Sequence, residues 1–231
     1  MKILLYVVLL TLSLSVKADI GEVEIDVGGV PISIKAPNGF REIILVSPET
    51  RKIMETLTPP TNRLLAGFVS EEDFGRIMKD EEPDFNRYIM LQSNRNLENR
   101  NFSKEQFQML TRQLKEQQNT ILQEQKSKVE KLLEGASKSF ADDFDTSVDI
   151  KMGEQITLGI FNDKPNTIGL MSLAKYSGEV GNDKFDYIMA GGVSFVLARG
   201  KLIYVYVFSL YESQNDIDWV KSKSRELIST L

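Results

Sequence analysis

Cysteine and histidine are both absent from this chain of 231 residues. Without cysteine there is no disulfide, no zinc–thiolate site and no thiol nucleophile. Without histidine the chain lacks the side chain that most often acts as a general base or as an imidazole ligand to a metal. The sequence therefore predicts no metal site, no cofactor and no identifiable catalytic residue, and any chemistry would use carboxylate, serine, lysine or tyrosine side chains.

Basic residues are fewer than acidic ones, 28 against 33, which gives a formal net charge of −5. Nucleic acid and anionic lipid obtain most of their affinity for proteins from Lys and Arg, so neither is expected as a partner. The composition, 42% hydrophobic and 26% charged, is typical of a globular protein. The length fits a single domain.

The N-terminal residues have the pattern of a signal peptide. Lys2 precedes an apolar run from Ile3 to Val16, and Val16 and Ala18 are small residues at the −3 and −1 positions of a cleavage site. The run is shorter than the roughly 20 residues that span a bilayer. We expect cleavage of residues 1–18, no stable membrane span afterwards, and a single globular α+β domain over residues 19–231 that is periplasmic or secreted.

The first half of the remaining chain alternates short strands with short helices. Alternating apolar residues in 22–27 and 30–34 flank Gly28-Gly29, which predicts a hairpin with a two-residue turn. Ser47 before Pro48 predicts the N-terminus of a short helix, and Ser70 predicts another. Further strands are expected over 64–69 and 88–92.

A long helix is predicted over about 103–134. This stretch has no Gly or Pro, opens with Ser103 and Gln106 as a capping box, and is followed by Gly135, which is typical of a helix end. At 1.5 Å per residue it would extend for about 48 Å. Because that exceeds the expected width of the sheet, we expect the helix to project or break at its glutamine-rich middle.

The last third predicts a β-meander followed by a C-terminal helix. The strand-like runs are 155–161, 167–176, 185–199 and 202–211. The run 202–211 is apolar on both faces, which indicates a central strand covered on both sides. Gly191-Gly192 indicates a bulge or the close approach of another element, and Asn215 or Asp216 is the expected N-cap of the final helix.

The order of these elements resembles that of the PsbP/DcrB-like α/β/α fold. The resemblance rests on the strand, proline, turn and aromatic in 32–40, which reads ISIKAPNGF, and on the late meander leading into a C-terminal helix. The segments 200–204 and 216–220 are also similar to small uncharacterised exported bacterial proteins. The resemblance implies an α/β/α sandwich with a mainly antiparallel sheet, and an accessory or binding role in an exported compartment.

Two other kinds of site are weakly indicated. Asp142, Asp143, Asp145 and Asp149 form a dense acidic cluster, but they lack the spacing of a calcium loop, and a solvated connection between helix and strand explains them better. A hydrolase with a pair of catalytic carboxylates stays an open alternative, because the separation of side chains in space is not visible in a sequence.

The predicted function is therefore a non-catalytic binding or accessory module of the cell envelope, and the alternative is a hydrolase that uses carboxylates. The partner is an unidentified protein or small molecule. Trp219 is predicted to lie off the buried stripe of the final helix, and tryptophan is enriched among residues that dominate interface energies. With Gln113 and Gln117 on the exposed side of the long helix, Trp219 is the predicted partner contact. The alternative is that Trp219 packs on a neighbouring loop of its own chain.

Overall fold

The structure is a computed structural model that describes residues 21–144 and 147–231, except for the side chains of residues 117–129 and 143–144. The predicted signal peptide, residues 1–18, lies outside these ranges.

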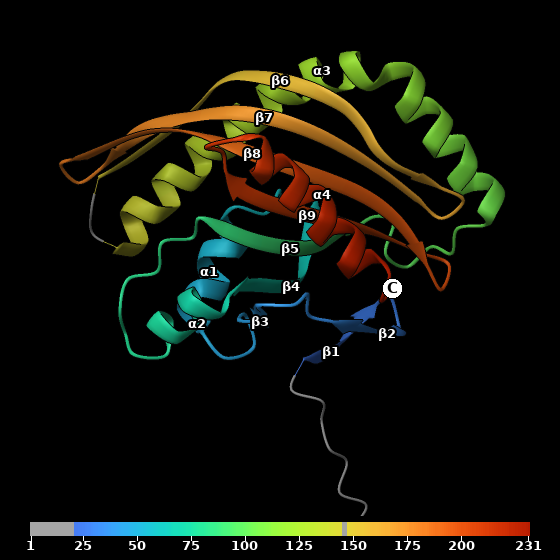
Figure 1. Cartoon of the computed structure of the whole chain (residues 1–231), viewed down its shortest axis with the longest axis horizontal. Helices are drawn as coiled ribbons and strands as arrows, with labels where there is room; N and C mark the ends of the chain where they lie inside the picture. The colour runs from blue at the N-terminus through green and yellow to red at the C-terminus, as the bar shows by residue number, and fades with distance from the viewer. Residues whose placement is uncertain (1–20, 145–146) are drawn as a thin grey trace, which may run out of the picture.

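The fold is centred on a seven-stranded sheet with the order β3-β4-β5-β9-β8-β7-β6 (Figure 1). Each pair of neighbouring strands is antiparallel. The strands are β3 (Phe40–Glu42), β4 (Asn62–Ser70), β5 (Arg87–Asn94), β6 (Val148–Lys164), β7 (Thr167–Val180), β8 (Asp183–Ala198) and β9 (Lys201–Leu210). The predicted meander is confirmed as β6 to β9, whose tight turns allow only antiparallel neighbours.

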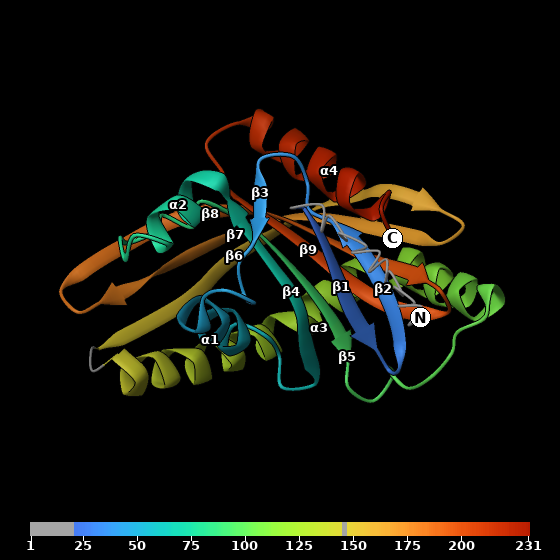
Figure 2. The ribbon, with the colours of Figure 1, turned by 90° about the horizontal axis from the view of Figure 1, so that it is seen from below.

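One face of the sheet is covered by a hairpin and the C-terminal helix (Figure 2). The hairpin consists of β1 (Glu22–Val27) and β2 (Val30–Lys35), with Gly28 and Gly29 at positive φ in its turn, as the sequence predicts. The helix is α4 (Gln214–Ile228), and its N-cap is Ser213 rather than Asn215 or Asp216. Asp216 instead occupies the third helical position and completes a capping box.

The opposite face carries α1 (Pro48–Thr56), α2 (Glu71–Ile77) and α3 (Lys104–Phe144). The Oγ atoms of Ser47 and Ser70 accept hydrogen bonds from the third residues of α1 and α2, so both predicted N-caps are confirmed. With helices on both faces, the fold is the α+β sandwich that the sequence predicts.

The long helix is longer than predicted. It begins with the expected capping box between Ser103 and Gln106, but it continues past Gly135 to Phe144. Glycine costs only about 1 kcal/mol in a helix interior, and packing beyond Gly135 outweighs that cost. Ala136 is buried, and the Ser137 hydroxyl accepts a hydrogen bond of 3.0 Å from the backbone N–H of Ile150 in β6.

The central position of β9 is confirmed, because β9 pairs with β5 on one side and β8 on the other. The Gly191-Gly192 pair marks a close approach rather than a bulge. A Cβ atom on Gly192 would lie 2.8 Å from Cγ1 of Val220, so the glycine lets α4 sit directly on β8. Among the helices in the described ranges, none is both long and apolar enough to cross a membrane.

Candidate functional site

The first six residues of β8 have a strand on one side only. They pair residue for residue with β7, whereas the pairing with β9 begins at Met189 and Leu210. The two outer strands of the sheet are less suited to accept a further strand. Three register shifts interrupt β6, and β3 has only three residues. The start of β8 is therefore a regular stretch of strand with one free edge.

The direction of the free backbone groups follows from one hydrogen bond. The carbonyl of Ile188 accepts a bond of 2.8 Å from the N–H of Tyr211, so the polar backbone groups of Ile188 point away from β7. In an antiparallel strand this direction alternates from residue to residue. The N–H and C=O groups of Lys184 and Asp186 therefore also point to the open side, where no strand of the described chain pairs with them.

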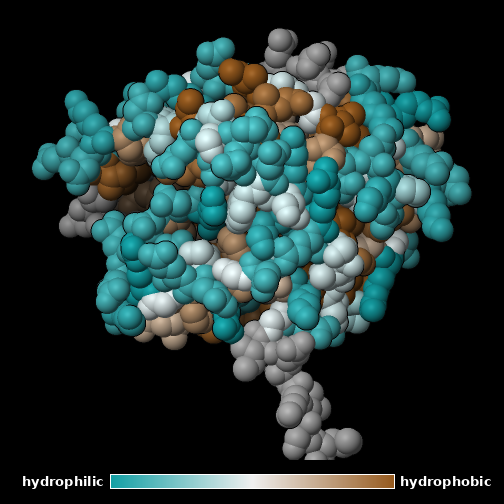
Figure 3. All heavy atoms as spheres, viewed as in Figure 1, coloured by the Kyte–Doolittle hydropathy of each residue, from teal (hydrophilic) through white to brown (hydrophobic). Residues whose placement is uncertain are grey.

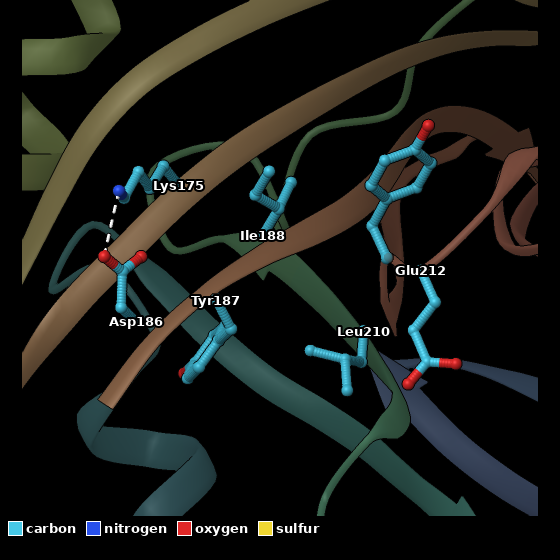
Figure 4. Close-up of a pocket in the computed structure, with 7 residues that line it drawn as sticks. Lys175, Asp186, Tyr187, Ile188, Leu210 and Glu212 are labelled. Atoms are coloured by element: carbon cyan, nitrogen blue, oxygen red, sulfur yellow. Dashed lines mark ion pairs between the residues drawn. The ribbon is translucent and has the colours of Figure 1, made fainter. Parts of the chain in front are cut away.

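A cleft of about 360 Å³ lies beside this free edge, and we call it the β8 cleft. Figure 3 shows a hollow with hydrophobic walls at the end of the molecule where β7 turns into β8. In Figure 4, Tyr187 and Leu210 lie on one side of the strands and Ile188 on the other. The lining residues are Lys175, Asp186, Tyr187, Ile188, Leu210, Tyr211 and Glu212.

Aromatic rings extend from the cleft across the face of the sheet that carries α1, α2 and α3. Tyr187 is 39% exposed, and its ring centroid lies 5.3 Å from that of Phe185 and 6.1 Å from that of Tyr176. On the neighbouring strands, Tyr88 and Phe208 stack with centroids 4.8 Å apart. Such rings offer a large apolar surface that loses little conformational entropy on binding.

The tyrosine hydroxyls of this region are recessed rather than fully exposed. Burial raises the pKa of Tyr176 to about 12, and it also raises the pKa values of Tyr88 and Tyr187. These phenols therefore stay neutral at physiological pH, and within the described residues none of the three hydroxyls has a hydrogen-bond partner. Of the three, Tyr187 lines the β8 cleft, where its hydroxyl is a neutral donor and acceptor for a bound molecule.

The cleft carries two carboxylates in different situations. Asp186 forms an ion pair of 2.9 Å with Lys175, and both side chains are exposed. Glu212 is exposed and has no ion-pair partner among the residues that the structure describes. A carboxylate hydrolase at this cleft would use Asp186 and Glu212 as its pair, since these two carboxylates line it.

The predicted partner contacts lie elsewhere. Trp219 is half-buried on α4, with its ring centroid 5.7 Å from that of Phe40 and 4.5 Å from the guanidinium carbon of Arg87. It therefore packs against its own chain, on residues of β3 and β5 rather than on the neighbouring loop of the alternative prediction. Gln113 is exposed on α3, and the side chain of Gln117 lies outside the described ones. The structure does not bring Trp219 and Gln113 into the β8 cleft.

The acidic cluster does not form a cation site within the described residues. Asp142 is exposed at the end of α3, and Asp149 pairs with Lys151 at 2.6 Å on β6. The side chains of Asp143 and Asp145 are outside the described part. In that described part, no group of three or more acidic side chains is arranged to hold a metal ion.

The β8 cleft was not identified from the sequence. Residues 183–188 read DKFDYI, whose polar and apolar alternation fits an ordinary strand. The one available signal was a difference in length, because β7 and β8 continue beyond the point where the apolar run of β9 ends at Tyr211. Which strand would lie beside that extension is decided by the topology of the sheet.

No protein-family model matches this chain, and no curated protein matches its sequence. Two solved structures align with it. One is the Saccharomyces cerevisiae Ran-binding protein Mog1p, with a TM-score of 0.37 and 12% identity over 91% of this chain and 94% of that chain. The other is a point mutant of Mog1, with a TM-score of 0.36 and 13% identity over 90% and 94% of the two chains. Similarities of this size carry no conclusion about partners, and the resemblance to the PsbP/DcrB-like fold stays a prediction.

Proposed function

We propose that this chain is an exported, non-catalytic binding module that takes up an extended polypeptide segment as an additional strand beside β8. The observation that carries the proposal is the outward direction of the backbone groups of Lys184 and Asp186, next to an open cleft. An unpaired strand edge binds extended peptides through main-chain hydrogen bonds, and the neighbouring pockets select the side chains.

The free edge defines the length of the segment it accepts. Residues 183–187 extend for about 17 Å at 3.4 Å per residue. The side chains of an added strand would alternate between the two faces of the sheet. Those on one face would contact Tyr187 and Leu210, which favours apolar or aromatic residues. Those on the other face would lie near Ile188, and a basic residue on the Leu210 side could pair with the free carboxylate of Glu212.

Two variants of one residue test the added strand. Peptides selected from a random display library on the purified protein would be measured against Asp186→Pro and Asp186→Ala. Both variants lose the ion pair with Lys175, but only proline removes the backbone N–H that faces the cleft, and that N–H is not bonded to β7. We expect Asp186→Pro to bind at least about 10-fold more weakly than Asp186→Ala.

Equal affinities for these two variants would contradict strand addition. The thermal unfolding of each variant would be compared with that of the wild type, because a folded Asp186→Pro protein is needed for the comparison.

Export is the second part of the proposal, and it is supported by the signal-peptide pattern of residues 1–18. Cell fractionation followed by N-terminal sequencing tests it. We expect the mature protein to begin at Asp19 and to be recovered outside the cytoplasm. A chain that keeps Met1 in the cytoplasmic fraction would contradict export and would leave the binding experiment unaffected.

A further inference from the structure

A second pocket, of about 230 Å³, lies at the opposite end of β9 from the β8 cleft. Its floor includes Phe195 and Tyr204, on the face of the sheet that carries α1, α2 and α3. Its wall includes Phe102 and Leu110, near the beginning of α3. Arg100 stands at its rim, on the connection between β5 and α3. Figure 2 shows this connection passing the tip of the β1–β2 hairpin. We call this the Arg100 pocket.

The floor of the Arg100 pocket suits one planar apolar group. The rings of Phe195 and Tyr204 meet edge to face, with centroids 5.2 Å apart and an interplanar angle of 68°. Both residues are half-buried, so each keeps part of its surface free. Ligand pockets commonly have volumes of about 300–1,000 Å³, so this smaller pocket fits a single ring better than a peptide segment.

The rim of the pocket is positively charged, although the chain as a whole is acidic. The Arg100 side chain is exposed and forms no ion pair with any residue in the described part. Lys201 does not line the pocket and is only 2% exposed, but its Nζ holds the segment that carries Arg100, because it donates to the carbonyls of Glu98 at 3.0 Å and Arg100 at 3.4 Å.

These carbonyls do not neutralise the ammonium charge of Lys201. The carboxylate of Glu98 is already held by Nε of Arg63 at 2.8 Å and by the hydroxyl of Ser93 at 3.0 Å. Of the residues that line the pocket, only Arg100 is charged, and no carboxylate of the described residues pairs with it, so its field attracts anions.

We infer that the Arg100 pocket binds a small organic carboxylate that carries one aromatic ring. The ring lies on Phe195 and Tyr204, and the carboxylate faces the guanidinium of Arg100, whose planar donors match the two carboxylate oxygens. The Tyr204 hydroxyl, which has no hydrogen-bond partner in the described chain, offers one further donor. This inference is independent of the proposed polypeptide site, because the two pockets share no residue.

The test uses 3-phenylpropionate as the probe and 3-phenylpropan-1-ol as its uncharged analogue, with binding followed by NMR titration of the backbone amides. We expect 3-phenylpropionate to bind with a millimolar or lower dissociation constant, and the alcohol to bind about 10-fold more weakly. The largest shifts should fall on residues 97–102, Phe195 and Tyr204.

Two charge-removing variants distinguish binding by Arg100 in the pocket from attraction by any positive charge nearby. Arg100→Gln should weaken the carboxylate by about 10-fold or more, whereas Lys104→Gln should change its affinity by less than about 2-fold. Lys104 is exposed at the first position of α3 and does not line the pocket, so it serves as the matched control. Equal effects of the two variants, no binding at about 10 mM probe, or shifts centred on the β8 cleft would each overturn the inference.

Discussion

The guanidinium carbon of Arg87 lies 4.5 Å from the ring centroid of Trp219, and the same guanidinium forms an ion pair of 3.0 Å with Asp216. Arg87 begins β5, whereas the other two residues belong to α4. Because a guanidinium is attracted to both a carboxylate and the face of an indole, this arrangement fixes the start of α4 on the sheet.

Trp219→Ala should lower the stability of the protein. The variant removes a half-buried ring from Phe40 and Arg87, and we expect a loss of about 2 kcal/mol, below the 3–5 kcal/mol of a fully buried aromatic. Thermal unfolding measures the loss, with Gln113→Ala as an exposed control that should change little. The predicted role of Trp219 in partner binding is tested on the same variant, since loss of a contact residue would weaken retention of a partner in a pull-down and leave unfolding nearly unchanged.

Asp216→Asn should make stability less dependent on pH. Burial pushes the pKa of Asp216 upward, but hydrogen bonds from the N–H groups of Glu212 and Ser213 and from Arg87 outweigh it and hold the pKa below its usual 3.8. A lowered pKa in the folded state stabilises the protein above the unfolded-state value, and this contribution is lost as pH falls through the folded-state pKa.

Denaturant titrations at several pH values check this. The deficit of Asp216→Asn relative to the wild type should be about 1–3 kcal/mol at pH 7 and should shrink below about pH 4. Asp218→Asn, an exposed position on the same helix, should show no such trend. If Asp216→Asn lost the same unfolding free energy at neutral and at acidic pH, the stabilisation would not come from the ionised Asp216 carboxylate.

Tyr206→Ala should lower the free energy of unfolding by about 3 kcal/mol. The Tyr206 ring lies on a central strand, where it packs with Met90, and its centroid is 6.3 Å from that of Phe208. Tyr206→Phe should be nearly neutral, since the hydroxyl has no hydrogen-bond partner within the described residues. Chemical unfolding of both variants separates the ring from the hydroxyl. A loss for Tyr206→Phe as large as that for Tyr206→Ala would show that the hydroxyl has a polar role.

Gly135→Ala should stabilise the protein by about 0.5–1 kcal/mol. Gly135 lies inside α3, and a Cβ atom built on it meets nothing within 4 Å. If the helix instead ended at Gly135 in a left-handed conformation, alanine would be destabilising. Gly192→Ala, where the added atom would lie 2.8 Å from Val220, should be destabilising by the same unfolding measurement.

The sequence by itself determined those features that depend on neighbours along the chain. The Gly28-Gly29 turn, the caps at Ser47, Ser70 and Ser103, and the two apolar faces of β9 all follow from local backbone preference or from the alternation of side chains. The absence of cysteine and histidine likewise restricted the available chemistry before any fold was known.

The tertiary structure decided the features that depend on contacts between distant residues. Gly135 reads locally as a helix end, but the bond between Ser137 and Ile150 extends α3 past it. Residues 183–188 read as a strand, but only the order of the sheet leaves one edge of that strand free. Arg100 and Tyr204 are about a hundred residues apart, and they line one pocket because β9 begins beside the segment that leads into α3. Such contacts form between segments whose separation in the chain carries no local signal, so the candidate sites became visible only when the chain was folded.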